Sequence, residues 1–169
     1  MGDLQVQVLI GSGSDADVMA STVRTLRDFK ITCDMTVASA HRSPDRVRRV
    51  MEAALGRGVQ VFVVGAGAAA HLAGVVAAHT TLPVIGLPVP TADLGGLDSL
   101  LSTVQMPGDV PVATMAVGMG GPRNSGLFAV QIMALSDPDL QQKLDDFKVN
   151  LVDKIGAKNS ALQDSLKKL

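Results

Sequence analysis

Residues 39–45, with the sequence SAHRSPD, place a titratable imidazole, that of His41, directly beside the permanent cation of Arg42. An imidazole can donate and accept a proton near neutral pH, and a guanidinium can hold a phosphate with two parallel hydrogen bonds. Residues 31–38 are rich in Ile, Thr and Val and predict a strand, and the Ser-Pro pair after His41 and Arg42 is typical of a helix start. The pattern therefore predicts a ligand site in a turn of about four residues between a strand and a helix.

A second polar turn, with the sequence GSGSD at residues 11–15, follows an apolar stretch over residues 4–10 that predicts a strand. Glycines let the backbone come close to a ligand, and amides at a helix start can hold a phosphate. The hydroxyl groups of Ser12 and Ser14 add hydrogen-bond donors. Taken alone the turn is a modest signal, because Ser14 or Asp15 could serve only as a helix cap.

A third turn, GAGAAAHLAG at residues 65–74, follows an apolar stretch typical of a strand in the middle of a parallel sheet. Its small residues permit close approach of the backbone to a ligand or to a neighbouring subunit. His71 is the one large polar side chain in this turn, and its alternative role is that of a helix-start residue bonded to the backbone. The third histidine, His79, is expected on a helix surface. Cys33, the single cysteine, is expected to be a buried small apolar residue rather than a nucleophile.

Apolar patterning predicts five strands, over residues 4–10, 31–38, 59–64, 83–87 and 112–117. Helices are predicted between them and after the fifth strand. This alternation predicts an α/β fold with three layers, a flavodoxin-like or Rossmann-like parallel sheet of order 2-1-3-4-5 with helices on both faces. In that order the ends of strands 1, 2 and 3 lie side by side, so the three turns are expected to converge on one crevice.

A last helix is predicted from Pro138, with apolar residues at spacings of three or four through Ile155. Because the faces of the sheet already have their helices, we expect this helix to make subunit contacts. Beyond Gly156 the helical pattern weakens, which predicts a partly ordered tail. Residues 1–169 are thus expected to form a single domain with a C-terminal helical extension from about residue 138.

The composition excludes several classes of partner. Fifteen basic and sixteen acidic residues give a net charge of −1, so no global field attracts nucleic acid or an anionic membrane. Hydrophobic residues make up 47% of the chain, yet no run approaches the roughly 20 apolar residues of a membrane span. The excess apolar surface favours a homo-oligomer, and the lack of a signal-peptide pattern predicts a cytoplasmic protein. Trp and Tyr are absent, which argues against a flavin held by aromatic stacking.

Five motifs in order resemble the PurE family, the N5-carboxyaminoimidazole ribonucleotide mutases of purine biosynthesis. They are GSGSD at 11–15, SAHRSPD at 39–45, AAAHLAG at 68–74, GGLDSLLSTVQMP at 95–107 and the glycine turn that ends at Asn124. The resemblance implies a substrate with a ribose 5-phosphate and an aminoimidazole ring, whose carboxylate moves from the exocyclic nitrogen to ring carbon 4. It also implies that no metal or organic cofactor is used and that the homo-oligomer is an octamer.

The resemblance assigns roles to individual residues. His41 resembles the general acid/base, and His71 resembles the residue that lines the pocket for the carboxylate and carbon dioxide. The positions that resemble contacts to the phosphate and ribose are Ser12, Asp15, Ser39 and Arg42, with Ser14 and Ala40 in the same loops. In the third turn, the positions expected to bind substrate are Gly67, Ala69 and Leu72.

Three positions depart from the family pattern: Ala16 stands where many members have Trp, Ala68 replaces a common glycine, and Ala73 stands where many have proline. These changes affect packing near the ligand turns more than the chemistry. Two alternatives stay open. The nearer is a carboxylase that joins free carbon dioxide to aminoimidazole ribonucleotide, and the more distant is a nucleotide-binding module without catalytic activity.

Overall fold

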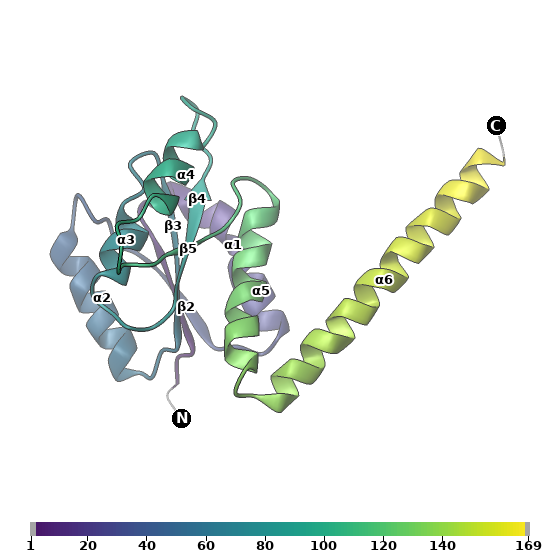
Figure 1. Cartoon of the computed structure of the whole chain (residues 1–169), viewed down its shortest axis with the longest axis horizontal. Coiled ribbons are helices and arrows are strands. Elements are labelled where there is room, and N and C mark those ends of the chain that lie inside the picture. Colours follow the sequence, from purple (N-terminus) through teal and green to yellow (C-terminus); the bar gives the residue numbers. More distant parts are fainter. Residues whose placement is uncertain (1–2, 168–169) are drawn as a thin grey trace. The chain divides into compact units, whose positions relative to one another are not determined.

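The computed structural model of the chain describes residues 3–167, which divide into two compact units with the boundary between Val130 and Gln131. The first unit contains one five-stranded sheet in the order β2-β1-β3-β4-β5, and every neighbouring pair of strands is parallel (Figure 1). The strands are β1 (Val6–Ile10), β2 (Cys33–Val37), β3 (Val61–Gly67), β4 (Val84–Val89) and β5 (Ala113–Thr114). The predicted α/β class and strand order are therefore confirmed.

The three inner strands, β1, β3 and β4, are buried along nearly their whole length, as expected of strands covered on both faces. Helix α1 (Ala16–Asp28) covers one face of the sheet, where a Cβ built on Gly65 would lie 2.6 Å from the sulfur of Met19. Gly65 therefore lets α1 approach β3 closely. Helix α5 (Gly120–Ala134) begins beside α1, because the Thr22 hydroxyl donates to the Pro122 carbonyl at 2.8 Å.

Three helices pack on the other face of the sheet: α2 (Pro44–Gly56), α3 (Leu72–Ala77) and α4 (Leu97–Val104). Buried residues of α2 and α3, such as Val47 and Val76, form one apolar cluster with Phe62 of β3. Each of these helices follows a strand end, so the helix starts are held close to the turns expected to bind a ligand. The predicted helices on both faces are confirmed.

The fifth strand is shorter than predicted, with two paired residues in place of the expected six at 112–117. Pro111, which has no N–H to donate, precedes it, and Gly118 at φ +94° marks a turn after it. β5 is therefore a short edge strand.

The second unit contains α6 (Pro138–Leu166), which begins at Pro138 as predicted, with the Asp137 carboxylate accepting the Leu140 N–H at 3.0 Å. The prediction of a weak tail beyond Gly156 is wrong, because the helix continues without a break to Leu166. One glycine inside a helix costs only about 1 kcal/mol, which the good helix formers that follow it offset. Across residues 3–167, no helix has both the length and the apolar character needed to cross a membrane.

Candidate active site

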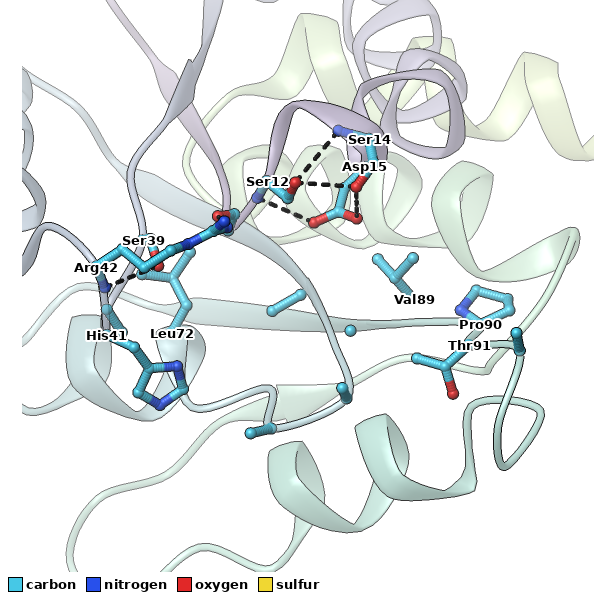
Figure 2. A pocket seen from close by; sticks show the side chains of 17 residues that line it. Ser12, Ser14, Asp15, Ser39, His41, Arg42, Leu72, Val89, Pro90 and Thr91 are labelled. Carbon is cyan, nitrogen blue, oxygen red and sulfur yellow. Dashed lines mark hydrogen bonds between the residues drawn. The ribbon is translucent and has the colours of Figure 1, made fainter.

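A cavity of about 560 Å³ lies where the carboxyl ends of β1, β2, β3 and β4 meet (Figure 2). Of the eleven residues predicted for the site, the ten that line this cavity are Ser12, Ser14, Asp15, Ser39, Ala40, His41, Arg42, Gly67, Ala69 and Leu72. His71 is the eleventh, and it lies outside the lining. The convergence of three turns, expected from the strand order, thus brings ten residues from distant parts of the chain together.

The first turn is organised by Ser12, which caps the short 3-10 helix η1 (Gly13–Asp15). Its hydroxyl accepts the Ser14 N–H, and the Asp15 carboxylate accepts the Ser12 N–H at 3.2 Å. The capping role expected of Ser14 or Asp15 as an alternative therefore belongs to Ser12 together with Asp15. Burial raises the pKa of the Asp15 carboxyl above its usual value, against the opposing effects of its hydrogen bonds and of Arg42.

The second turn is held by Ser39 and Ser43. The Ser39 hydroxyl accepts the Arg42 N–H at 3.2 Å (Figure 2). The Ser39 N–H donates to the Ser43 hydroxyl at 3.1 Å. Ser43 stands at the N-cap of α2 with proline next, as predicted, but its side chain bonds back to Ser39 instead of capping the helix. The turn runs from residue 38 to residue 43 and is thus longer than predicted, because these hydrogen bonds close a wider loop.

The guanidinium of Arg42 reaches from the second turn to the first, where it donates to the Gly11 carbonyl at 3.2 Å. Its positive charge is close enough to Asp15 to lower the pKa of that carboxyl in part. Within residues 3–167, Arg42 forms no ion pair with an acidic residue. The other N–H groups of this cation can therefore bind an anion in the cavity.

His41 and His71 are joined by a hydrogen bond, with Nε2 of His41 2.8 Å from Nδ1 of His71. The rings meet edge to face, with centroids 4.9 Å apart and planes at 82°. His71 stands at the N-cap of α3 but makes no capping bond with its side chain, so the alternative of a simple helix-start residue is wrong. His71 is connected to the cavity through His41, which does line it.

Arg46 of α2 was not among the site residues predicted from the sequence. Arg46 lines a second cavity of about 400 Å³ that shares Gly11, Ser12 and Arg42 with the first. Its Nε donates to the Val37 carbonyl at 2.8 Å. Arg46 lies in the first turn of α2, three residues after the Ser43 N-cap, and a cation beside a helix start is the signal that could have found it.

A fourth segment of the lining, at the end of β4 and just beyond it, was also missed; it comprises Val89, Pro90, Thr91 and Ala92. Thr91 is held in place by α4, because its hydroxyl donates to the Asp98 carboxylate at 2.9 Å and accepts the Gly96 N–H at 3.3 Å. Two prolines and two glycines in residues 88–96 indicated a shaped loop but not its position beside the cavity.

The third turn contains Ala68 at φ +55°, in the left-handed region that glycine enters without strain. An alanine there costs roughly 1–2 kcal/mol. This departure from the family pattern therefore places a strained residue in the wall of the cavity.

The remaining chemically active side chains lie outside this cavity. Cys33 is half-buried instead of fully buried, since β2 is the edge strand, and burial raises the pKa of its thiol, which disfavours the nucleophilic thiolate. His79 is exposed on the surface, as predicted, and its Nδ1 lies 2.7 Å from the Val75 carbonyl. In the part of the chain that the structure describes, no group of three or more His, Cys, Asp or Glu residues could hold a metal ion.

The fold and the cavity define a doubly wound α/β protein with a crevice, lined by a cation and several hydroxyl groups, at the point where the strand order reverses. The model of the AIR carboxylase family matches residues 5–154, and the chain belongs to this family.

Two relatives named N5-carboxyaminoimidazole ribonucleotide mutase illustrate the similarity. The protein from Mycobacterium tuberculosis is 47% identical, over 94% of this chain and 90% of its own, and that from Bacillus subtilis is 48% identical, over 86% and 90%. Among solved structures, Treponema denticola PurE matches with a TM-score of 0.83 and 25% identity, over 94% of this chain and 98% of its own. A variant of PurE2 from the same organism matches with a TM-score of 0.85 and 23% identity, over 94% and 97%, and supports the fold.

Proposed function

We propose that this protein is an isomerase, a mutase that moves the carboxylate of N5-carboxyaminoimidazole ribonucleotide from the exocyclic nitrogen to ring carbon 4 in purine biosynthesis. The product is 4-carboxy-5-aminoimidazole ribonucleotide, and the reaction takes place in the cytoplasm. The observation that carries the proposal is that His41, which is hydrogen-bonded to His71, lines one cavity together with a cation and several hydroxyl groups. The names of the relatives at 47% and 48% identity agree with it.

The polar end of the cavity suits the ribose 5-phosphate. One guanidinium N–H of Arg42 is bonded to Gly11, and the others can donate to a phosphate. Ser12 and Ser39 add hydroxyl groups, so the phosphate binds between the first and second turns. The second cavity, with Arg46, extends this end and adds positive charge. Asp15 can accept a hydrogen bond from a ribose hydroxyl, with the other residues of both turns fixing the orientation of the sugar.

His41 is the proton carrier in this mechanism. The carbamate nitrogen takes a proton as its bond to the carboxylate carbon breaks, which releases carbon dioxide and leaves an amine on the ring. Ring carbon 4 then attacks carbon dioxide with the electron pair of the ring double bond, and the proton on that carbon leaves. One imidazole can supply the first proton and take the second, so no net proton is consumed.

His71 assists by orienting His41. Their hydrogen bond engages Nε2 of His41 and leaves its Nδ1 without a partner among the described residues. Next to this pair, Gly67, Ala69 and Leu72 form a wall with little polar surface. Such a wall suits carbon dioxide, because excluding water keeps the gas from hydrating before it is recaptured.

The direct test is incubation, without ATP, with each candidate substrate in turn. We expect conversion of N5-carboxyaminoimidazole ribonucleotide to its carbon-carboxylated isomer. Efficient turnover only of aminoimidazole ribonucleotide with carbon dioxide would contradict the mutase and support a carboxylase, the second candidate, which the description of the family model favours. Failure to turn over either substrate, with tight binding of the nucleotide, would support the module without catalytic activity.

The protein acts as a homo-oligomer in this proposal, with an octamer as the expected assembly. Large apolar side chains are exposed on one side of α4, where Leu97, Leu101 and Val104 are 46–55% exposed. In the second unit, α6 exposes Val149, Val152 and Ile155. Contiguous exposed apolar surface of this kind marks subunit contacts in a closed symmetric assembly. Light scattering at micromolar concentration tests this, and a monodisperse monomer would contradict it.

A further inference from the structure

Ser99 of α4 is a fully buried polar residue directly behind the cavity. Its hydroxyl accepts the Ala68 N–H at 2.9 Å and donates to the Val89 carbonyl at 2.7 Å. Ala68 belongs to the turn after β3 and Val89 to the end of β4, and both line the cavity. One hydroxyl group therefore joins two neighbouring parts of the cavity wall from behind.

The bond to Ala68 has a particular consequence, because Ala68 is in the left-handed conformation. An alanine leaves this conformation easily unless its peptide groups are held. Ser99 holds the N–H of Ala68. The Ser102 hydroxyl also lies 3.3 Å from the Ala68 carbonyl, but its single proton is shared with the Asp98 carbonyl, which is closer at 2.7 Å. The bond from Ser99 is therefore the main hold of α4 on the strained residue.

The conformation of Ala68 also determines where His71 lies. The Ala70 N–H donates to the Ala68 carbonyl at 2.8 Å, and the His71 N–H donates to the Ala69 carbonyl at 2.8 Å. These two hydrogen bonds restrict the conformation of the backbone between Ala68 and the start of α3. A change of the backbone at Ala68 must therefore move His71, and with it the hydrogen bond to His41.

We infer that Ser99 is a positioning residue of the active site, which acts through Ala68 to hold His71 in contact with His41. It also keeps in place the cavity wall formed after β3 and β4, which contains small residues such as Gly67 and Ala69. The inference rests on the proposed function for its kinetic consequences, but the structural effect on the two histidines is independent of it. Ser99 does not itself line the cavity. Its removal should therefore alter the chemical step more than the binding of the phosphate and ribose, which lie on the other side.

The variant Ser99→Ala tests this inference, with Thr103→Val as a matched control. Thr103 is also buried on α4, but its hydroxyl donates to the Ser99 carbonyl of the same helix at 2.7 Å and reaches no part of the cavity. We expect Ser99→Ala to lower kcat about tenfold or more with KM changed less than about threefold, because small misplacements of reacting groups are costly. Thr103→Val should leave both constants nearly unchanged.

Rescue provides the second arm. Glycine adopts the left-handed conformation without help, so adding Ala68→Gly to Ser99→Ala should restore at least half of the lost kcat on a logarithmic scale. If Ser99→Ala does not fold, Ser99→Cys replaces it in both the kinetic comparison and the rescue. Cysteine keeps a side chain of similar size but is only a weak donor. Equal behaviour of the Ser99 and Thr103 variants, or no gain from Ala68→Gly, would overturn the inference.

A third readout separates this inference from the proposed function. In the ligand-free protein, imidazole ¹⁵N chemical shifts report on the His41–His71 hydrogen bond whether or not any substrate is turned over. We expect these shifts to change in Ser99→Ala, to return in the double variant and to stay unchanged in Thr103→Val. Unchanged shifts in Ser99→Ala would refute the positioning role even if the protein proves to be a mutase. Changed shifts without mutase turnover would refute only the proposed function.

Discussion

The two sides of the cavity are built differently. The side formed by the turns after β1 and β2 presents charged and hydroxyl side chains, among them Ser12, Asp15 and Arg42. The side formed after β3 and β4 presents mainly backbone and small apolar groups, such as Gly67, Ala69 and Pro90. We refer to them as the polar wall and the small-residue wall. The first can bind by charge and hydrogen bonding, whereas the second contributes mainly through its shape.

The two walls are also held in place differently. In the polar wall most hydrogen bonds are local, such as Ser12 to Asp15 and Ser39 to Ser43, so each turn largely orders itself. In the small-residue wall the hydroxyl that holds Ala68 comes from Ser99, 31 residues later in the chain. A wall that acts through shape thus depends on a distant helix, while a wall that acts through side chains depends mainly on its own sequence.

The largest effect should come from removing His41, the proposed proton carrier in the polar wall. His41→Asn keeps some size and hydrogen bonding but cannot transfer a proton, so turnover should fall by about 10² to 10⁴ while substrate binding survives. His71→Asn removes only the partner of His41 and should cost about tenfold, near the net value of one hydrogen bond. Steady-state rates and substrate binding of the two variants decide this. A His71 variant that is inactive beside a His41 variant with near-normal turnover would reverse the roles of the two residues.

The next effect should come from the cation of the polar wall. Arg42→Ala removes charge-assisted hydrogen bonds to the phosphate, each worth about 1.5–3 kcal/mol, so substrate affinity should fall roughly 10- to 100-fold. Arg49→Ala, which removes an exposed cation from the same region of the chain, is the control for net charge. Titration calorimetry with the substrate or product measures the affinity, and thermal unfolding measures stability. Normal affinity with reduced stability would mean that Arg42 only braces Gly11.

The smallest effect concerns the pH dependence of stability at Asp15. Burial raises the pKa of this carboxyl in the folded state above the usual 3.8, so its protonated form favours folding. Its contribution is complete below pH 3.8 and is lost as the pH rises through the folded-state pKa. Relative to Asp15→Asn, the wild type should therefore become less stable across the interval just above pH 3.8. Urea unfolding at a series of pH values measures the difference.

Comparison with the variant is needed because other carboxylates act in the opposite direction. The pKa of Asp3 is lowered by its hydrogen bond with Arg57, so its contribution is lost as the pH falls. That contribution is the same in wild type and Asp15→Asn and cancels in the difference. If the difference in unfolding free energy between wild type and Asp15→Asn stays constant over this interval, burial does not raise the pKa of the Asp15 carboxyl. The polar wall would then be more open to solvent than its geometry indicates.

The class of fold, the strand order and the residues of the polar wall could be predicted from sequence patterns alone. Strand and helix patterns are local, and in a parallel sheet of this order the ends of strands 1 to 3 must come together, so Ser12, His41 and Arg42 could be placed in one crevice. The start of α6 was predictable for the same reason, because Asp137 and Pro138 form a local signal. The helix beyond Gly156 was missed, since one unfavourable residue does not end a helix whose neighbours favour it.

The interactions between these elements could not be predicted from the sequence and depend on tertiary packing. Three features join side chains or backbone from different elements: the bond between His41 and His71, the position of Arg46 beside Arg42, and the bonds of Ser99 to Ala68 and Val89. Their spacing in the sequence contains no period that would reveal them. They depend on the crossover paths of α2, α3 and α4 and on how closely each helix packs on the sheet, which are set by the packing of the whole unit and not by any local pattern.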